Sequence, residues 1–203
     1  MEGGLTSVSR ETSERLQAFE QLLIKWNKRI NLIARKDQDT IRTRHIQDSA
    51  QLVEHLPDNA RDWLDLGSGG GFPGLVVAAM TRETRPDLGF TLVESDTRKA
   101  AFLREAARAL DLRVRVEAVR IEDLPPRKVD VISARALAPL PTLLALSERF
   151  CRSGTTLLFL KGRTVESELT HARQDWHITA DRIPSVTDPD ACILKITGPE
   201  RHS

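Results

Sequence analysis

Trp63-Leu64-Asp65-Leu66-Gly67-Ser68-Gly69-Gly70-Gly71-Phe72-Pro73-Gly74 is the stretch that decides the fold. It begins as a short apolar strand and runs directly into glycines. Glycine has no side chain to obstruct a ligand and takes positive φ, so the backbone can turn sharply and present its N–H groups at the start of a helix. Pro73 suits the first turn of that helix, where its missing N–H would be unpaired anyway. We therefore expect a strand, a ligand-binding loop and a helix.

The same loop fits two ligand-binding patterns. Residues 69–74 spell G-x-G-x-x-G, the pattern of dinucleotide-binding folds. The first glycine, Gly67, nevertheless follows the strand directly, and the register Asp65-x-Gly67-x-Gly69-x-Gly71 resembles the first motif of class I methyltransferases. In that class the loop holds the aminoacyl part of S-adenosylmethionine. The resemblance therefore favours S-adenosylmethionine over a dinucleotide, with Gly67, Gly69 and Gly71 as cofactor-binding candidates.

Downstream of the loop, apolar runs alternate with helical patterns, which is typical of a parallel sheet covered by helices. The expected strands are 63–66, 90–93, 114–119, 129–133, 155–160 and 191–196. The expected helices are 74–82, 97–110, 139–150 and 165–174. Together with the methyltransferase motif, this predicts a Rossmann-like α/β domain over residues 59–203, with a mostly parallel seven-stranded sheet and helices on both faces.

Residues 1–58 have a different character and are expected to form a helical extension. Apolar side chains recur every three or four residues from Leu16 to Ile30, which predicts an amphipathic helix over residues 10–30. A second, shorter helix is expected over residues 40–56. Between Lys25 and His45, seven basic residues accompany two acidic ones. Such a cluster is typical of a phosphate-binding surface, although solvated helix faces carry similar runs.

Two further elements stand where parallel strands are expected to end. Glu94 follows strand 90–93, about where a carboxylate that accepts from both hydroxyls of a ribose should lie. Ile121 and Glu122 follow strand 114–119; Ile121 is placed to pack against adenine, and Glu122 or its backbone to meet the exocyclic amine. Alone, these residues would be a solvent-facing acid and an ordinary polar turn. Ligands of open parallel sheets bind along this edge, which makes them candidates.

Composition limits the remaining classes of protein. The chain has 203 residues, 40% apolar and 29% charged, which suits one globular domain with a modest extension. No stretch approaches the roughly 20 apolar residues of a membrane span, and residues 1–15 are polar rather than signal-like, so we expect a cytoplasmic protein. Cys151 and Cys192 lack partners at zinc-site spacings, so we expect reduced thiols and no metal site.

Five segments carry a more specific resemblance. They are Trp26-Asn27-Lys28-Arg29-Ile30-Asn31-Leu32, Arg44-His45-Ile46-Gln47-Asp48-Ser49, the loop Gly67–Gly74, Ile132-Ser133-Ala134-Arg135-Ala136 and Leu160-Lys161-Gly162. In this order and spacing they resemble the bacterial RsmG (GidB) family across about residues 15–197. The resemblance implies S-adenosylmethionine as cofactor and 16S ribosomal RNA or the small ribosomal subunit as partner. We expect a monomer that binds no membrane.

The resemblance also implies roles for particular residues. Cofactor binding falls on Gly67, Phe72, Ile121, Glu122 and Arg135, with Glu94 added from the wider methyltransferase class. We expect Arg135 and Lys161 to act at the reaction centre by holding guanine O6 or phosphate; the alternative is that both are salt-bridge partners. Arg44 and His45 are candidates for RNA contacts, although His45 could equally be a packed, hydrogen-bonded histidine.

The implied reaction transfers a methyl group to N7 of a guanine in ribosomal RNA. Guanine N7 is a lone-pair acceptor without a proton, so no general base is required. The sequence agrees, because it has no tyrosine and no Asn-Pro-Pro-Tyr motif of amine methylation. Two rival interpretations remain: a nicotinamide-dependent oxidoreductase, suggested by the G-x-G-x-x-G spelling, and an RNA-binding protein without activity.

Overall fold

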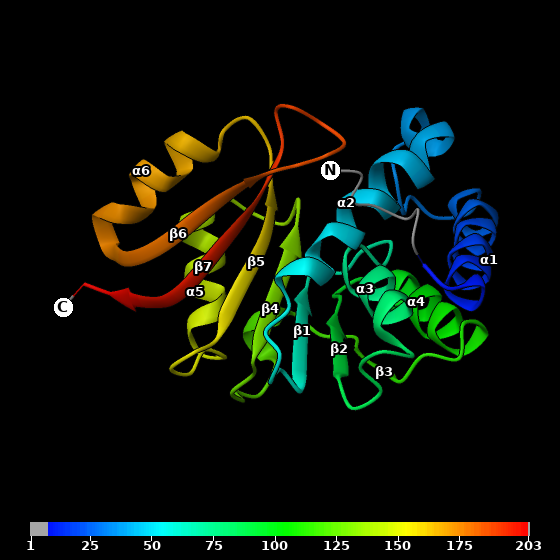
Figure 1. Ribbon diagram of the computed structural model, residues 1–203, viewed down its shortest axis with the longest axis horizontal. Helices are drawn as coiled ribbons and strands as arrows, with labels where there is room; N and C mark the ends of the chain where they lie inside the picture. Colours follow the sequence, from blue (N-terminus) through cyan, green and yellow to red (C-terminus); the bar gives the residue numbers. More distant parts are fainter. Residues whose placement is uncertain (1–7, 203) are drawn as a thin grey trace.

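The computed structural model describes residues 8–202 and is built on one seven-stranded sheet (Figure 1). The strand order is β3-β2-β1-β4-β5-β7-β6. The strands are β1 (Asp62–Leu66), β2 (Gly89–Val93), β3 (Val114–Glu117), β4 (Val131–Arg135), β5 (Thr156–Lys161), β6 (Trp176–Pro184) and β7 (Cys192–Arg201). Strands β1 to β5 pair in parallel, and β7 pairs antiparallel with both β5 and β6. This confirms the predicted mostly parallel α/β sheet.

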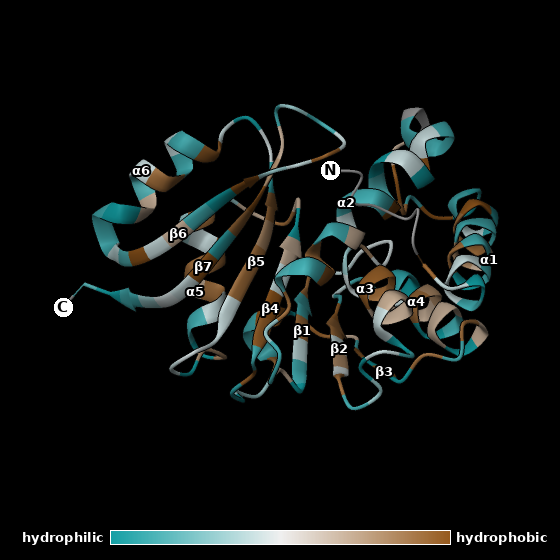
Figure 2. Ribbon diagram, in the orientation of Figure 1, coloured by the Kyte–Doolittle hydropathy of each residue, from teal (hydrophilic) through white to brown (hydrophobic). Residues whose placement is uncertain are grey.

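Helices cover both faces of the sheet. They are α1 (Arg10–Asn27), α2 (Gln47–Ala50), α3 (Gly74–Thr81), α4 (Thr97–Ala109), α5 (Leu140–Glu148) and α6 (Val165–Asp175). One buried cluster joins α1, α3 and α4 to one face, and a second joins α5 and α6 to the other. Alternate residues of a strand point to opposite faces, so Trp63 enters the first cluster and Leu64 the second. Figure 2 shows the resulting apolar central strands and the polar outer helix surfaces.

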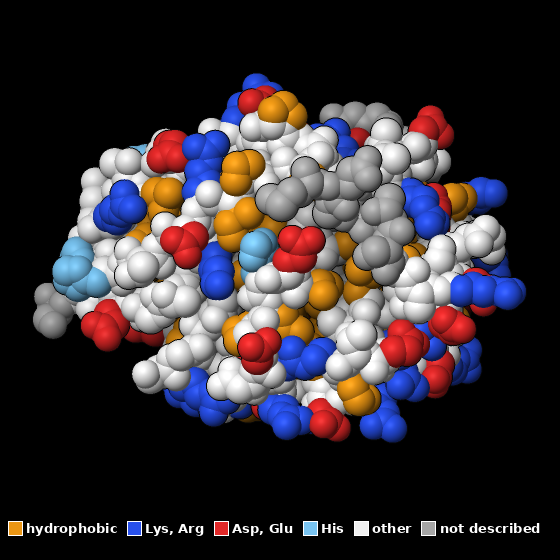
Figure 3. All heavy atoms as spheres, in the orientation of Figure 1, with side chains coloured by type: hydrophobic (Ala, Val, Ile, Leu, Met, Phe, Trp, Pro, Cys, Tyr) orange, Lys and Arg blue, Asp and Glu red, His pale blue; other side chains and the backbone are white. Residues whose placement is uncertain are grey.

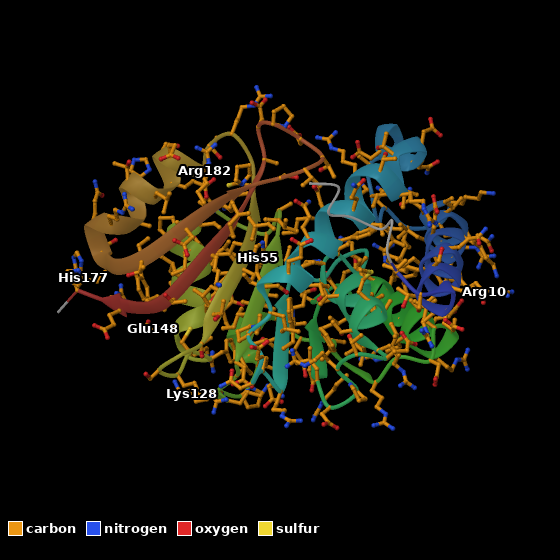
Figure 4. All side chains as sticks on the ribbon, viewed as in Figure 1. Arg10, His55, Lys128, Glu148, His177 and Arg182 are labelled. Carbon is orange, nitrogen blue, oxygen red and sulfur yellow. The ribbon has the colours of Figure 1, made fainter. Side chains whose placement is uncertain are left out.

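The chain reverses direction across the sheet at β1 and β4. From β1 the next strands, β2 and β3, extend the sheet one way, whereas β4 and β5 extend it the other way. Connections from β1 and β4 therefore diverge and leave a crevice at the carboxyl ends of these strands. Lys128, labelled in Figure 4, lies just before β4 and marks the opposite, amino-terminal end of the sheet. The fold thus provides one edge for a ligand.

Helix α1 anchors the extension on the helices that follow β1 and β2. The ring of Phe19 lies 5.3 Å from that of Phe72, and Trp26 lies 5.8 Å from Phe102. The helix ends at Asn27 rather than at the predicted Ile30. The Asn27 side-chain oxygen accepts hydrogen bonds from the N–H groups of Leu32 and Ile33, at 2.8 and 3.1 Å, and so turns the chain away from the helix axis.

The single helix predicted over residues 40–56 is wrong. The structure has a 3-10 turn over Arg35–Thr40, a π-helical turn over Ile41–Ile46, the short α2, and a second 3-10 turn over Gln51–His55. The buried Ile41 and Ile46 are five residues apart, a spacing that the wider π turn places on one face. This irregular segment runs past the carboxyl ends of the strands in Figure 1.

Strand β6 is absent from the prediction. Trp176, Ile178 and Ala180 alternate with polar residues, but the segment ends in Pro184 and forms the sheet edge, where half of its side chains stay in solvent. His177 and Arg182, labelled in Figure 4, lie along this strand. Within residues 8–202, no helix is long and apolar enough to cross a membrane. On the face drawn in Figure 3, basic and acidic side chains are interspersed.

Candidate active site

The glycine loop forms the floor of the site at the end of β1. Gly67 and Gly69 have φ of +67° and +50°, a region that side chains disfavour. A Cβ on Gly67 would lie 2.6 Å from a methyl carbon of Leu137, so the loop backbone meets the chain after β4 directly. The loop leads into α3 at Gly74. Gly67 and Gly69 are partly exposed, so the backbone of the tight turn is available to a ligand in the crevice.

Glu94 holds this loop in place. Its Oε2 accepts a hydrogen bond from the Gly69 N–H at 2.8 Å, and its Oε1 accepts one from the Asp96 N–H at 2.8 Å. Only 8% of the residue is exposed. A carboxylate offers about four lone-pair sites, so two accepted bonds leave capacity for ribose hydroxyls. Glu94 therefore joins the loop to the start of α4 and still faces the crevice.

Asp65 lies beneath the loop and is completely buried. Its Oδ1 accepts a 2.6 Å hydrogen bond from Ser133, whose hydroxyl in turn accepts one from the Trp63 indole at 2.7 Å. Its Oδ2 has no hydrogen-bond partner among the described residues, and a Cβ on Gly74 would come within 2.8 Å of it. Burial raises the pKa of Asp65 to about 6, opposed by the Ser133 hydrogen bond. No role for Asp65 was expected from the sequence.

A cavity of about 490 Å³ opens above the loop, a volume typical of small-molecule sites. Most of the predicted cofactor-binding residues line it: Gly67, Gly69, Phe72, Glu94, Ile121, Glu122 and Arg135. Gly71 does not; its N–H instead donates to the Ser68 carbonyl at 2.7 Å within the turn. Ile121 forms a buried apolar wall, whereas Glu122 is exposed, and a hydrogen bond with its own backbone lowers its pKa.

Arg135 stands at the end of β4 between Phe72 and His45. Its guanidinium carbon lies 4.6 Å from the Phe72 ring centroid, and its Nη1 lies 2.7 Å from His45 Nδ1. Burial lowers the pKa of Arg135 to about 10, which leaves it charged at neutral pH. Burial, followed by the charge of Arg135, lowers the pKa of His45 to about 4. His45 is thus packed, hydrogen-bonded and neutral in the structure, and its contact with RNA stays a prediction.

A second cavity, of about 590 Å³, adjoins the first. Residues 135–138 line both cavities, so Arg135 stands at their boundary. The other walls of the second cavity come from segments far apart in the sequence. They include Asp48 of α2, Lys161 at the end of β5, and Ser185 and Ala191 between β6 and β7. Figure 1 shows the β6–β7 connection reaching toward the irregular segment that contains α2.

Both other predicted RNA-contacting cations line this second cavity, and both have acidic partners. Lys161 is almost buried; its Nζ pairs with Glu168 Oε2 at 2.5 Å and donates to the Ala138 carbonyl at 3.1 Å. Arg44 is half exposed and pairs with Asp188 at 3.2 Å. An exposed ion pair such as that of Arg44 contributes little stability and can exchange its partner for a phosphate.

Several lining residues were missed in the sequence. Leu32 and Lys99 line the first cavity, Asp48 lines the second, and Leu137 lines both. Ala136 adopts a φ of +50°, which is unusual for a residue with a side chain. No local pattern singled out these positions: Lys99 lies in the first turn of α4, Asp48 lies in α2, and Leu137 follows β4. Leu32 and Asp48 do lie in quoted family segments, and that was the available signal.

The fold and the site define a class I S-adenosylmethionine-dependent methyltransferase. The fold is similar to a structure from Listeria monocytogenes described as a class I S-adenosylmethionine-dependent methyltransferase, with a TM-score of 0.65, 15% identity, and coverage of 92% of this chain and 68% of that one. It is also similar to a mutant of MtNAS in complex with S-adenosylmethionine, with a TM-score of 0.56, 14% identity, and coverage of 93% and 76%.

The sequence places the chain more narrowly. It belongs to the GidB family, described as rRNA small subunit methyltransferase G, whose profile matches residues 12–192. A relative from Cereibacter sphaeroides, named ribosomal RNA small subunit methyltransferase G, is 56% identical over 189 residues, which are 93% of this chain and 92% of the relative. The predicted family is thereby confirmed, and the nicotinamide-dependent oxidoreductase is set aside.

Proposed function

We propose that this chain transfers a methyl group from S-adenosylmethionine to N7 of one guanine in 16S ribosomal RNA. The observation that carries the proposal is the meeting of two cavities at Arg135. One cavity has the glycine loop and Glu94 of a nucleoside site; the other has cationic and acidic groups and apolar walls. Two adjoining cavities suit a reaction that brings a methyl donor and a base into contact.

The residues of the first cavity fit S-adenosylmethionine, which supplies a methyl group on a cationic sulfur. The backbone at Gly67 and Gly69 lacks the side chains that would fill the cradle. Glu94 retains acceptor capacity for a ribose diol, and Ile121 offers an apolar surface for adenine. We assign cofactor binding to these residues together with Phe72, Glu122 and Arg135, and leave Gly71 with a role in the turn.

The chemistry requires little beyond alignment. The N7 lone pair forms the new N–C bond while the S–C bond of the donor breaks and its electron pair stays on sulfur. No proton leaves N7, so no base is needed. Arg135 and Lys161 are assigned to guanine O6 or phosphate, because a donor placed on N7 itself would block the attacking lone pair. Their contribution is orientation and a suitable field.

The remaining assignments concern the assembly. We propose residues 59–203 as the methyltransferase domain and residues 1–58 as an extension that adds basic surface beside the site; residues 1–7 lie outside the described part of the chain. Arg44 contacts RNA phosphate, and His45 acts indirectly by positioning Arg135. The protein works as a cytoplasmic monomer on ribosomal RNA and binds no membrane.

Mass mapping of small-subunit RNA tests the proposal directly. The protein is incubated with labelled methyl donor and either free 16S RNA or small subunits, and the methylated nucleotide is then located. We expect one guanine that carries the label at N7, recognised by chain cleavage after borohydride and aniline treatment. A label on a ribose or an exocyclic amine contradicts the N7 assignment, and no label on either substrate favours an RNA-binding protein without activity. Light scattering of the active fraction tests the monomer.

A further inference from the structure

Asp48 presents one anchored and one free carboxylate oxygen. It lies in α2 and lines the second cavity. Its Oδ1 accepts hydrogen bonds from Ser185 at 2.9 Å, from Gln51 at 3.3 Å, and from the Thr187 hydroxyl. Its Oδ2 has no hydrogen-bond partner among the described residues. The anchoring fixes the carboxylate, so its second oxygen is a positioned acceptor.

Two of the other three acids that line this cavity are paired with cations. Asp188 pairs with Arg44 and Glu168 with Lys161, whereas Asp37 lies 3.8 Å from Nε2 of the neutral His45 without a hydrogen bond. Within residues 8–202, Asp48 has no ion pair with a basic side chain within 4.0 Å. Asp48 is therefore an anchored cavity acid that a ligand with donor groups can engage without displacing a protein cation.

The positions of Arg135 and Asp48 in the two cavities match the hydrogen-bonding groups of guanine. Arg135 lines both cavities, whereas Asp48 lines only the second, so Arg135 is nearer to the cofactor loop. Guanine has acceptors N7 and O6 on one edge, and donors N1–H and N2–H on the adjoining edge. With N7 toward the donor methyl and O6 at Arg135, the N1–H and N2–H edge faces away from the cofactor. Pro139 and Leu160 provide apolar walls for the ring.

We propose that Asp48 selects guanine by accepting hydrogen bonds from its N1–H and N2–H groups. The inference rests on the proposed function and extends it to the base-reading residue. Adenine has an unprotonated N1 and no N2 amine at this edge. Its N1 is an acceptor, so it would face the carboxylate of Asp48, another acceptor, without a hydrogen bond. Methyl transfer also moves positive charge from sulfur onto the base. A carboxylate on the base edge favours that charge as it develops.

Asp48→Asn is the first variant of the test. The amide oxygen can keep the bonds from Ser185, Thr187 and Gln51, so the fold should survive, while an NH₂ group replaces the free acceptor. We expect kcat/KM on small-subunit RNA to fall about 10- to 100-fold, the usual effect of losing a hydrogen bond to a charged group. Calorimetric affinity for S-adenosylhomocysteine and the melting temperature should stay close to wild type, since Asp48 does not line the first cavity.

Base replacement then separates recognition from structure. The RNA is assembled by ligation with guanine or hypoxanthine, which lacks the N2 amine, at the methylated position, and is assayed free and in reconstituted subunits. Wild type should prefer guanine about tenfold or more, and Asp48→Asn should bring this ratio near one. Asp188→Asn, a cavity acid already paired with Arg44, controls for lost charge and should keep the wild-type ratio, whatever its overall rate.

The outcomes are distinct. A wild-type preference for guanine that persists in Asp48→Asn overturns the assignment of Asp48 while leaving guanine methylation intact. Equal wild-type rates on guanine and hypoxanthine overturn it as well, because no N2 contact then exists. If the wild type modifies no guanine N7 at all, the proposed function fails and the base-reading role with it.

Discussion

Arg135 and His45 are joined by a contact of 2.7 Å between the guanidinium Nη1 and the imidazole Nδ1. Arginine has only donors, so Nδ1 must be the acceptor, and the proton of the neutral ring sits on Nε2. Nε2 points toward Asp37 at 3.8 Å without a hydrogen bond. The irregular segment of the extension thereby orients the arginine that stands between the two cavities.

His45→Phe should slow methylation without abolishing cofactor binding. Phenylalanine keeps a ring against Phe72 but removes the acceptor of Arg135. Loss of a hydrogen bond to a charged group predicts a fall in kcat/KM on RNA of about tenfold or more. Because the pKa of His45 is about 4, the wild-type rate should show no inflection near pH 6.5 from this residue. An unchanged rate in the variant would mean that the Phe72 contact alone places Arg135.

Glu94→Gln should weaken cofactor binding by tenfold or more. Both oxygens of Glu94 accept backbone N–H groups, and an amide would turn a donor toward one of them. The loop at Gly69 is then released, and the ribose loses a charged acceptor. Calorimetry with S-adenosylmethionine gives the affinity, and thermal melting without ligand reports the cost to the fold. Wild-type affinity in a stable variant is the result that removes Glu94 from the site.

Lys161 can be tested against its structural alternative with a pair of variants. Lys161→Met leaves Glu168 without its cation, so it should lower both stability and turnover. Adding Glu168→Gln removes the unpaired charge and should restore much of the stability. If Lys161 holds the RNA, turnover in the double variant stays about tenfold or more below wild type, with cofactor affinity intact. Recovery of turnover together with stability would identify Lys161 as a salt-bridge residue only.

Arg44→Ala should reduce the salt dependence of RNA binding. Each phosphate neutralised by a cation contributes about 0.7 to 0.9 to the slope of log K against log salt. We therefore expect the slope measured by filter binding to shrink by about that amount. Arg61→Ala is the matched control, since Arg61 is an exposed arginine paired with Asp87 at the other end of β1. Equal slopes for the wild type and both variants would argue against a phosphate contact by Arg44.

Asp65 predicts a pH dependence of stability with a definite sign. Its pKa is raised to about 6 from an ordinary value of 3.8, so between these values the folded chain holds a proton that the unfolded chain has lost. This contribution to stability is fully present below about pH 3.8 and is lost as the pH rises through about 6, by an amount on the order of 3 kcal/mol. Urea unfolding of wild type and Asp65→Asn between pH 4 and 7 should differ by this slope. Parallel curves would show that Asp65 does not titrate there.

The fold was largely readable because its strongest signals are local. The run into Gly67, the alternation of apolar runs and helices, and the stripe of α1 each report a regular element. The prediction failed where the structure of a segment does not follow from its local sequence pattern. Strand β6 lies at the sheet edge, where only Trp176 is buried, and residues 35–55 follow tertiary contacts such as those of Ile41 and Ile46 rather than one helical period.

The candidate site was likewise predicted only in part from the sequence. Residues at strand ends, such as Glu94 and Arg135, stand where the parallel sheet must place them, and both line the first cavity. The partners of the site residues could not be predicted, because tertiary packing brings them together. The Gly69 N–H reaches Glu94 across 25 positions of sequence, His45 reaches Arg135 across 90, and Glu168 reaches Lys161 across 7. Their roles in catalysis stay predictions until the variants are made.

The hydrogen bond from Ser185 to Asp48 ties together segments 137 residues apart. During synthesis, the nucleoside cavity is assembled from residues up to about 146, but the wall of the second cavity awaits the β6–β7 connection. A growing chain therefore contains the residues that line the donor cavity well before it contains those that enclose an acceptor. Activity on RNA should appear only once the last hairpin has left the ribosome and docked, which makes the reaction itself a report of finished folding.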